Sequence, residues 1–381
     1  SYLASSEITP GHPNTAKGFE AYLATRRIPG ALAISEVMPA NDKHLIQSDG
    51  EYYDWVELKN ISDSAIELAD YAISDDSSDP TLFRLPQQTL QPGEMVIIIL
   101  SGNTDLTGRY IHAPFSLNKQ EFWFYVTHLA EGYSDYIHVK DVPLACTAGR
   151  KGTDPGVLYF ATPTPGQENA TGYAEVTADP FVQTPGGIYN DITQLSVVLS
   201  GDGDIYYTLD GSVPNTASYK YTQPITINRT TTVRAICYSR DKLPSKVVTT
   251  GYIINENHTL PVLSVAVDPD AMFGGGGIYV NYTQNIEIPC NLSLYENGQG
   301  FSVDCGIKMF GHTGLQAAKK SFKINFRSRY GDSLLTYPVY GEDGPEVYDS
   351  LIIRSGQDYP YSIFRDELFT SLCRQMSDKV L

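Results

Sequence analysis

The sequence contains no apolar run that could span a membrane. Its longest apolar stretch is MVIIIL at positions 95–100, whereas a transmembrane helix needs ~18 residues or more. Basic residues are also scarce, since 27 Lys and Arg accompany 44 Asp and Glu and leave a net charge of −17. Nucleic-acid binding depends on basic residues that neutralise phosphates. We therefore expect neither a membrane span in this chain nor a nucleic-acid partner.

Cysteine and tryptophan are rare too. The five cysteines show no Cys-x-x-Cys spacing, so the sequence predicts no zinc site. The acidic loop DDSSD at 75–79 offers carboxylates that calcium could use, but the favoured interpretation is a solvated loop, and we predict no metal site. Only two Trp occur, so no aromatic platform for a sugar is visible, and we expect Trp55 to lie in a core.

Short runs of β-forming residues dominate what is present. In the first half of the chain they lie at 32–37, 55–58, 66–73, 95–100 and 122–126, and Gly and Pro separate them. Such short, turn-punctuated strands are typical of antiparallel sandwiches. A length of 381 residues suffices for two or three domains of ~100 to 200 residues each. We therefore predict a mainly β chain of several modules.

Four motifs give the first module a family resemblance. They are ISEV at 34–37, DWVELKN at 54–60, LQPG at 90–93 and TPTPG at 162–166. In this order they resemble a lamin-tail domain of the bacterial extracellular kind. The resemblance implies an immunoglobulin-like sandwich over residues 30–172 that serves attachment or spacing rather than chemistry.

A second module is expected over residues 180–256. An alternating run that ends in Asp210-Gly211 predicts a strand followed by a tight turn. The motifs IYYTLDGSVP at 205–214 and TTTVRA at 230–235 are similar to the small β domain at the C-terminus of chitobiase and hexosaminidase chains. This resemblance implies another immunoglobulin-like sandwich, with an accessory role and no catalytic groups.

One short motif occurs twice. TPGHPN at 9–14 shares Thr, Pro, Gly and Asn with TPGQEN at 164–169, and a Gly followed by an aromatic residue comes after each copy. Because the later copy closes the first module, the earlier one predicts that residues 1–29 comprise the tail of a preceding module and a linker. A short linking helix is expected at 19–25.

A third module is expected over residues 260–381. Strands are predicted at 261–267 and 321–326, a hairpin at 286–308, and apolar residues at four-residue spacing predict a helix at 364–372. The sequence therefore favours an α+β fragment after the two sandwiches.

Several motifs give this third module a resemblance of its own, to the spore-coat CotH kinase-like family. They are CGIKMFGH at 305–312, KKSFKI at 319–324, LIIR at 351–354 and RDEL at 365–368. The resemblance implies a truncated kinase-like domain whose full-length form uses ATP and Mg to phosphorylate an exported protein. Its catalytic residues are expected beyond Leu381, so we expect the chain as given to be inactive, with neither ATP nor Mg bound.

Six basic residues gather in this module, and no acidic residue lies between 305 and 331. They are Lys308, Lys319, Lys320, Lys323, Arg327 and Arg329. Phosphoryl transfer needs cations on the phosphates. By the resemblance, Lys320 or Lys323 would face the phosphates beside Arg327 and pair with Glu367 or Asp366. Lys320 and Lys323 should point to opposite faces of a strand, so only one of them can serve. The alternative is that all six are solvated surface charges.

The hairpin of the third module also carries two cysteines. Asn297-Gly298 favours a two-residue turn, and the register that this turn sets places Cys290 directly opposite Cys305. A disulfide is possible in an oxidising compartment. Two reduced thiols packed as small apolar side chains are the equal alternative.

These patterns predict a modular bacterial protein of the extracellular space or cell surface. Its sandwiches would serve adhesion or spacing, its kinase-like domain would be incomplete, and its partner would be a protein substrate or a cell-surface polymer. We expect a monomer. The alternative is a non-enzymatic surface adhesin that binds glycan or cell-wall polymer.

Overall fold

The computed structural model describes residues 11–12, 15, 17–18, 21–22 and 30–355, except 119–120, 153, 155, 297, 317 and 342–343. The protein is mainly β, with 41% strand and 5% helix. Its residues group into two compact units, Ser1–Ala178 with Cys237–Lys246, and Asp179–Ile236 with Val247–Leu381. Among the described residues, no helix is long and apolar enough to cross a membrane.

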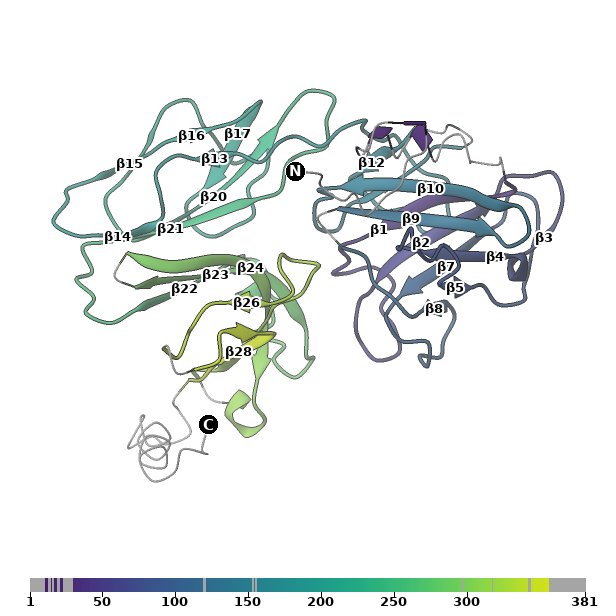
Figure 1. The fold of residues 1–381 in the computed structure, drawn as a ribbon. Helices are drawn as coiled ribbons and strands as arrows, with labels where there is room; N and C mark the ends of the chain where they lie inside the picture. The colour runs from purple at the N-terminus through teal and green to yellow at the C-terminus, as the bar shows by residue number, and fades with distance from the viewer. Residues whose placement is uncertain are drawn as a thin grey trace. The chain divides into compact units, whose positions relative to one another are not determined.

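The first module is a sandwich of two sheets, and Figure 1 shows β9 and β10 running in front of β1 and β2. The larger sheet has the order β12 (Leu158–Phe160), β11 (Thr147–Gly149), β1 (Leu32–Met38), β2 (Asp54–Asn60), β7 (Met95–Leu100) and β8 (Ile111–Ala113). The smaller sheet has the order β10 (Gly132–Lys140), β9 (Glu121–His128), β4 (Tyr71–Ser74) and β5 (Phe83–Arg84). A short pair, β3 (Ile66–Glu67) and β6 (Thr89–Leu90), and the 3-10 turn η1 (Leu68–Asp70) complete it.

The core of this sandwich follows from the two-residue period of its strands. In β9, Phe122, Phe124 and Val126 point between the sheets, because alternate side chains of a strand face one side. The central strand β1 is buried at all seven positions, including its polar residues Ser35 and Glu36. A buried carboxylate needs hydrogen-bond partners. The polar contacts of β1 are therefore described below with the candidate sites.

The second module contains a five-stranded sheet and two short strand pairs. The sheet has the order β14 (Gly187–Tyr189), β21 (Val248–Ile254), β20 (Thr231–Tyr238), β17 (Asp204–Thr208) and β18 (Tyr219–Lys220). The pairs are β13 (Phe181–Val182) with β16 (Leu199–Ser200), and β15 (Leu195–Val197) with β19 (Ile225–Ile227). The predicted turn at Asp210-Gly211 is present, since Gly211 has φ +87° and the Ser212 N–H donates to Asp210 Oδ1 at 3.0 Å.

One loop of the second module groups with the first unit. Residues 237–246, the last two residues of β20 and most of its connection to β21, belong to the first unit, and the Leu243 N–H donates to the Glu175 carbonyl at 2.9 Å. The Thr177 N–H donates to the Leu243 carbonyl at 2.8 Å. The boundary between the two units is therefore discontinuous in sequence.

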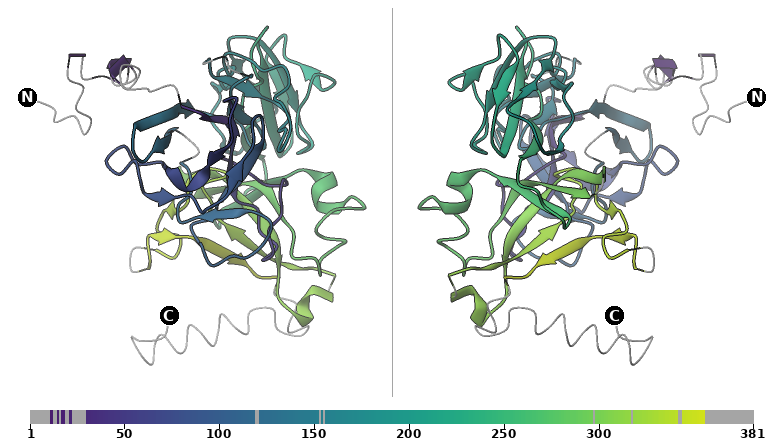
Figure 2. Two further views of the ribbon diagram at one scale, coloured as in Figure 1. Left: turned by 90° about the vertical axis from the view of Figure 1, so that its right-hand side faces the viewer. Right: turned by 90° about the vertical axis from the view of Figure 1, so that its left-hand side faces the viewer.

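The third module is one antiparallel sheet, which can be followed from green to yellow in Figure 2. Its order is β22 (Val262–Val267), β23 (Glu287–Glu296), β24 (Gln299–Phe310), β25 (Ser321–Asn325) and β28 (Ser350–Ile353). Connections carry the short helix α2 (Pro269–Phe273), the 3-10 turn η2 (Thr313–Gln316) and the pair β26 (Leu335–Thr336) with β27 (Val347–Tyr348). The predicted strands are thus present, whereas α2 was not predicted because only five residues form it.

The expected α+β, kinase-like character is not supported by the described part of this module. Its only α-helix among the described residues is α2, which starts at Pro269 and is capped by the Asp268 side chain through the Asp270 N–H at 2.9 Å. The predicted helix at 364–372 lies outside the described residues, as does most of the predicted linking helix at 19–25.

Candidate functional site

The cationic residues of the third module do not form one patch. Arg327 and Arg329 both pair with Glu287 at the start of β23, where Arg327 Nε lies 2.9 Å and an Arg329 terminal nitrogen 2.5 Å from Glu287 Oε1. Burial alone would raise the pKa of Glu287, but the two guanidinium groups outweigh it and lower that pKa. Sequence analysis missed this partner because it precedes the arginines by about 40 residues.

Lys320 is buried rather than presented to a ligand. It is 8% exposed, and its ammonium group lies 4.2 Å from the centroid of the Tyr282 ring and 5.3 Å from that of Tyr279. The same ammonium group donates to the Leu315 carbonyl. Aromatic faces and a carbonyl satisfy a cation away from water, so these contacts give Lys320 a structural role.

Of the predicted cluster, Lys308 and Lys323 are the two residues that lie directly next to each other. They are directly opposite each other on β24 and β25, and both are half-buried. Phe322 and Ile324 pack into the core, so Lys323 between them points to the other face of β25. Lys320 precedes this strand. Neither Lys308 nor Lys323 has an ion pair within the described residues. The expected partners Asp366 and Glu367 lie outside those residues.

The predicted hairpin register is confirmed. Cys290 pairs with Cys305 across β23 and β24, and their sulfur atoms lie 3.5 Å apart. Both side chains are buried, and the contact with the Cys305 thiol, followed by burial, raises the pKa of Cys290. Gly298 has φ +80°, as the turn requires, while Asn297 lies outside the described residues.

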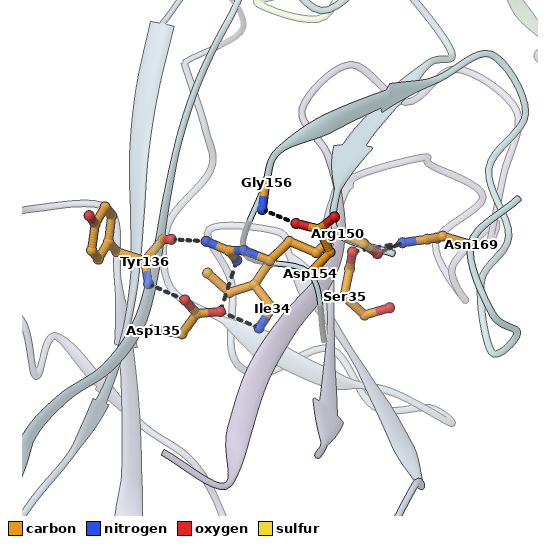
Figure 3. A network of polar contacts seen from close by, with 8 residues as sticks. All are labelled: Ile34, Ser35, Asp135, Tyr136, Arg150, Asp154, Gly156 and Asn169. Carbon is orange, nitrogen blue, oxygen red and sulfur yellow. Dashed lines mark hydrogen bonds and ion pairs between the residues drawn. The ribbon is translucent and has the colours of Figure 1, made fainter. Parts of the chain in front are cut away.

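A buried ion pair joins the two sheets of the first module (Figure 3). An irregularity in β10 turns Asp135 inward, where its Oδ2 accepts from Arg150 at 2.8 Å and from the Ile34 N–H of β1 at 2.9 Å. Arg150 also donates to the Tyr136 carbonyl, and the Tyr136 N–H donates to Asp135 Oδ1 at 2.8 Å. Each carboxylate oxygen is therefore occupied from within the sandwich, which is the arrangement of a structural clamp.

The two tryptophans do not provide a flat platform. Trp55 is fully buried, as predicted. Trp123 stands on the outer face of β9, with its ring stacked on His138 at a centroid distance of 4.1 Å and parallel to Tyr125 at 6.2 Å. Because neighbouring side chains cover the faces of the indole, Trp123 has little free ring surface for a sugar.

A pair of neighbouring tyrosines, one exposed and one half-buried, lies on the second module instead. Tyr207 of β17 and Tyr219 of β18 are directly opposite each other, and their ring centroids lie 5.6 Å apart at an interplanar angle of 33°. Tyr219 is 67% exposed. The sequence did not single out this pair, because the loop between the strands hides which tyrosines become neighbours.

Metal-binding clusters are absent from the described residues. No group of three or more His, Cys, Asp or Glu side chains there could hold an ion. In the acidic loop, Asp76 Oδ1 accepts from the Ser78 N–H at 2.8 Å and from the Ser78 hydroxyl at 2.7 Å. These bonds lower the pKa of Asp76 and form a turn in an exposed loop.

Two models of known families match parts of the chain. A model described as Lamin Tail Domain matches residues 26–137. The first module is lamin-tail-like. A model described as Fn3 associated matches residues 195–252, within the second module. No curated protein matches the chain.

These two matches indicate a modular protein built of β domains. The lamin-tail resemblance that the sequence predicted is therefore confirmed. The second match is to the Fn3-associated family, and the comparisons contain no counterpart of the chitobiase-like or CotH kinase-like resemblance. Those two relationships stay predictions.

Proposed function

We propose that this chain is a non-catalytic attachment protein of the bacterial cell surface, in which the β modules hold a polymer such as a glycan. The observation that carries the proposal is the stacked pair of the exposed Tyr219 and the half-buried Tyr207, within the region that the Fn3-associated model matches. Exposed neighbouring aromatic rings offer apolar faces that pack against sugar rings, and their hydroxyl groups add hydrogen bonds.

The other buried or paired charged side chains make ion pairs that stabilise the fold. Asp135 and Arg150 join two sheets, and Glu287 engages Arg327 and Arg329. An attachment role requires such rigid modules and one accessible contact surface, and it requires no reacting groups.

The test is the binding of the full chain to a panel of glycans and cell-wall polymers. We expect binding that Tyr219→Ala and Tyr207→Ala each weaken at least tenfold. Phe181→Ala is the matched control, because Phe181 is an aromatic residue of the same module that is 68% exposed. Absence of binding by the wild-type chain, or equal losses in all three variants, would reject the proposal. Fractionation of the source cells tests the proposed location.

A second candidate function is phosphate binding by the third module in a kinase-like reaction that uses ATP and Mg. The opposition of Lys308 and Lys323 favours it, because like charges on adjacent strands repel each other and a bound anion would relieve that repulsion, although Glu287 already faces Lys308 from β23. We expect Lys323→Ala and Lys308→Ala to reduce ATP–Mg binding, whereas Lys319→Ala serves as the exposed control. Unchanged nucleotide affinity in the first two variants would leave these lysines as solvated charges.

A further inference from the structure

The segment at 164–169, the later copy of the repeated motif, closes the first module by binding two buried glutamates. Glu36 of β1 and Glu57 of β2 are partners across neighbouring strands, and both are completely buried. Glu36 Oε2 accepts from the Thr164 N–H at 3.1 Å, and Glu57 Oε2 accepts from the Gly166 N–H at 2.5 Å. Each buried carboxyl therefore accepts a hydrogen bond from one backbone N–H of this segment.

Asn169 fixes the other end of the segment. Its side-chain amide donates to the Ser35 carbonyl at 2.8 Å and to the Arg150 carbonyl at 2.7 Å, as Figure 3 shows. Its Oδ1 accepts from the Thr164 hydroxyl at 2.8 Å. The acceptor side of this site thus consists of Ser35, Glu36, Glu57 and Arg150.

A type II turn gives the segment its shape. Pro165 and Gly166 occupy the two central positions, Gly166 has φ +77°, and the Gln167 N–H donates to the Thr164 carbonyl at 2.9 Å. Glycine is needed at the second central position because a side chain is strained at positive φ.

The repeat at 9–14 preserves the residues that make these contacts. Thr9, Pro10, Gly11 and Asn14 match the four residues that form the turn or bind the acceptor. Gly11 has φ +82°, close to the value of its counterpart.

The two positions that differ between the copies face solvent. Gln167 and Glu168 are exposed, and His12 and Pro13 take their places in the repeat. The Glu168 N–H makes no hydrogen bond among the described residues, so a proline, which lacks that N–H, fits there. The turn residues and Asn169 are shared between the copies, whereas the two variable positions are exposed and add only the surface ion pair between Glu168 and Lys59. This is the pattern expected of two ligands for one kind of site.

We propose that Ser35, Glu36, Glu57 and Arg150 form a binding site for Thr-Pro-Gly-x-x-Asn segments, and that residues 9–14 of a second copy of this chain can occupy it. Residues 164–169 fill the site in the resting chain. A tethered segment has a high effective concentration, so the segment from a second copy enters only when the resident one is weakened.

The test uses a fluorescent peptide of residues 6–18 and the full chain carrying Asn169→Ala. The chain also carries Asn14→Ala, so that its own repeat does not compete. We expect saturable binding in fluorescence anisotropy, at least tenfold tighter than to a chain with Asn14→Ala alone, in which residues 164–169 still occupy the site. A peptide with Asn14→Ala should bind at least tenfold more weakly to the doubly substituted chain.

A milder variant guards against misfolding of the Asn169→Ala chain. Thr164→Val with Asn14→Ala removes the Thr164 hydroxyl and keeps its N–H, so it should also bind the peptide if the site exists. No saturable binding to whichever of these variants remains folded by circular dichroism, or equal binding of the two peptides, would overturn the proposal.

Discussion

At the scale of single residues, the buried charged side chains join neighbouring strands. Asp135 and Arg150 are 1% and 8% exposed as side chains, and each makes further bonds to backbone groups of β1 or β10. Removing one partner of such a pair leaves the other buried without a counter-charge.

Replacing Arg150 should therefore destabilise the lamin-tail-like module. We expect Arg150→Leu to lower its free energy of unfolding by about 3–5 kcal/mol, the range for a broken buried pair. Lys246→Met is the matched control in the same unit, since Lys246 pairs with Asp141 at the surface and should contribute little. Urea denaturation measures both, and similar losses in the two variants would contradict the structural role of the buried pair.

Two buried glutamates should respond to pH in opposite directions. Burial raises the pKa of Glu36, whereas the neighbouring arginines outweigh burial and lower the pKa of Glu287. The contribution of Glu36 to stability is present at low pH and is lost as the pH rises above 4.5 through its raised value. The contribution of Glu287 is present above 4.5 and is lost as the pH falls through its lowered value.

Neutral substitutions measure this difference. Relative to the wild type, Glu36→Gln should become more favourable as the pH rises, while Glu287→Gln should cost most near neutral pH and less in acid. Thermal unfolding between about pH 3.5 and 7.5 checks both trends. Parallel pH profiles for the two variants would show that the assigned environments are wrong.

At the scale of elements, the hairpin of β23 and β24 depends on glycine at one unusual position. Gly300 has φ +139°, and a Cβ there would lie 1.8 Å from the Leu294 carbonyl oxygen. Gly298 has φ +80° with open space around it. The two glycines thus differ in crowding, although Gly298 lies in the turn and Gly300 only two residues later in β24.

Backbone strain at positive φ alone costs about 1–3 kcal/mol. Gly300→Ala should lower the stability of the third module by more than this, because the added methyl group also collides with the Leu294 carbonyl oxygen. Gly298→Asn should have a small effect, since Asn tolerates positive φ. Circular dichroism during thermal unfolding compares the two. An Ala variant as stable as the Asn variant would mean that the hairpin has a different register.

Oxidation of the same hairpin should join its two buried cysteines. A bridge between Cys290 and Cys305 closes a short loop and should add about 3 kcal/mol to stability in the chain-entropy estimate. Mass spectrometry after mild oxidation should find this bridge, and Cys305→Ser should abolish it. Exclusive bridging of either cysteine to Cys237 or Cys146 would contradict the prediction.

At the scale of the whole molecule, two compact units share one chain. Each has its own buried cluster, with Leu32 and Phe124 in the first and Leu292 and Ile307 in the second. Units with separate cores can unfold separately.

Differential scanning calorimetry should therefore resolve two transitions. Arg150→Leu should shift one of them, and Gly300→Ala should shift the other, because each substitution lies in a different unit. A single transition that both variants shift equally would indicate one cooperative unit.

Local patterns in the sequence determined the strands, the turns and the register of one hairpin. The run of β-forming residues at 321–326 predicted strand β25, and Asn297-Gly298 placed Cys290 opposite Cys305 without any long-range information. These features depend on residues close in sequence, whose geometry the backbone period and the turn type fix.

Only the tertiary structure decided which polar groups meet. The basic cluster looked continuous in sequence, yet Glu287 takes two of its arginines and Tyr282 covers Lys320. The motif at 164–169 was visible as a repeat, but its binding to Glu36 required strands that are about 128 residues away. Contacts between distant strands depend on how sheets stack and where their strands bulge, and no local pattern of residues encodes that.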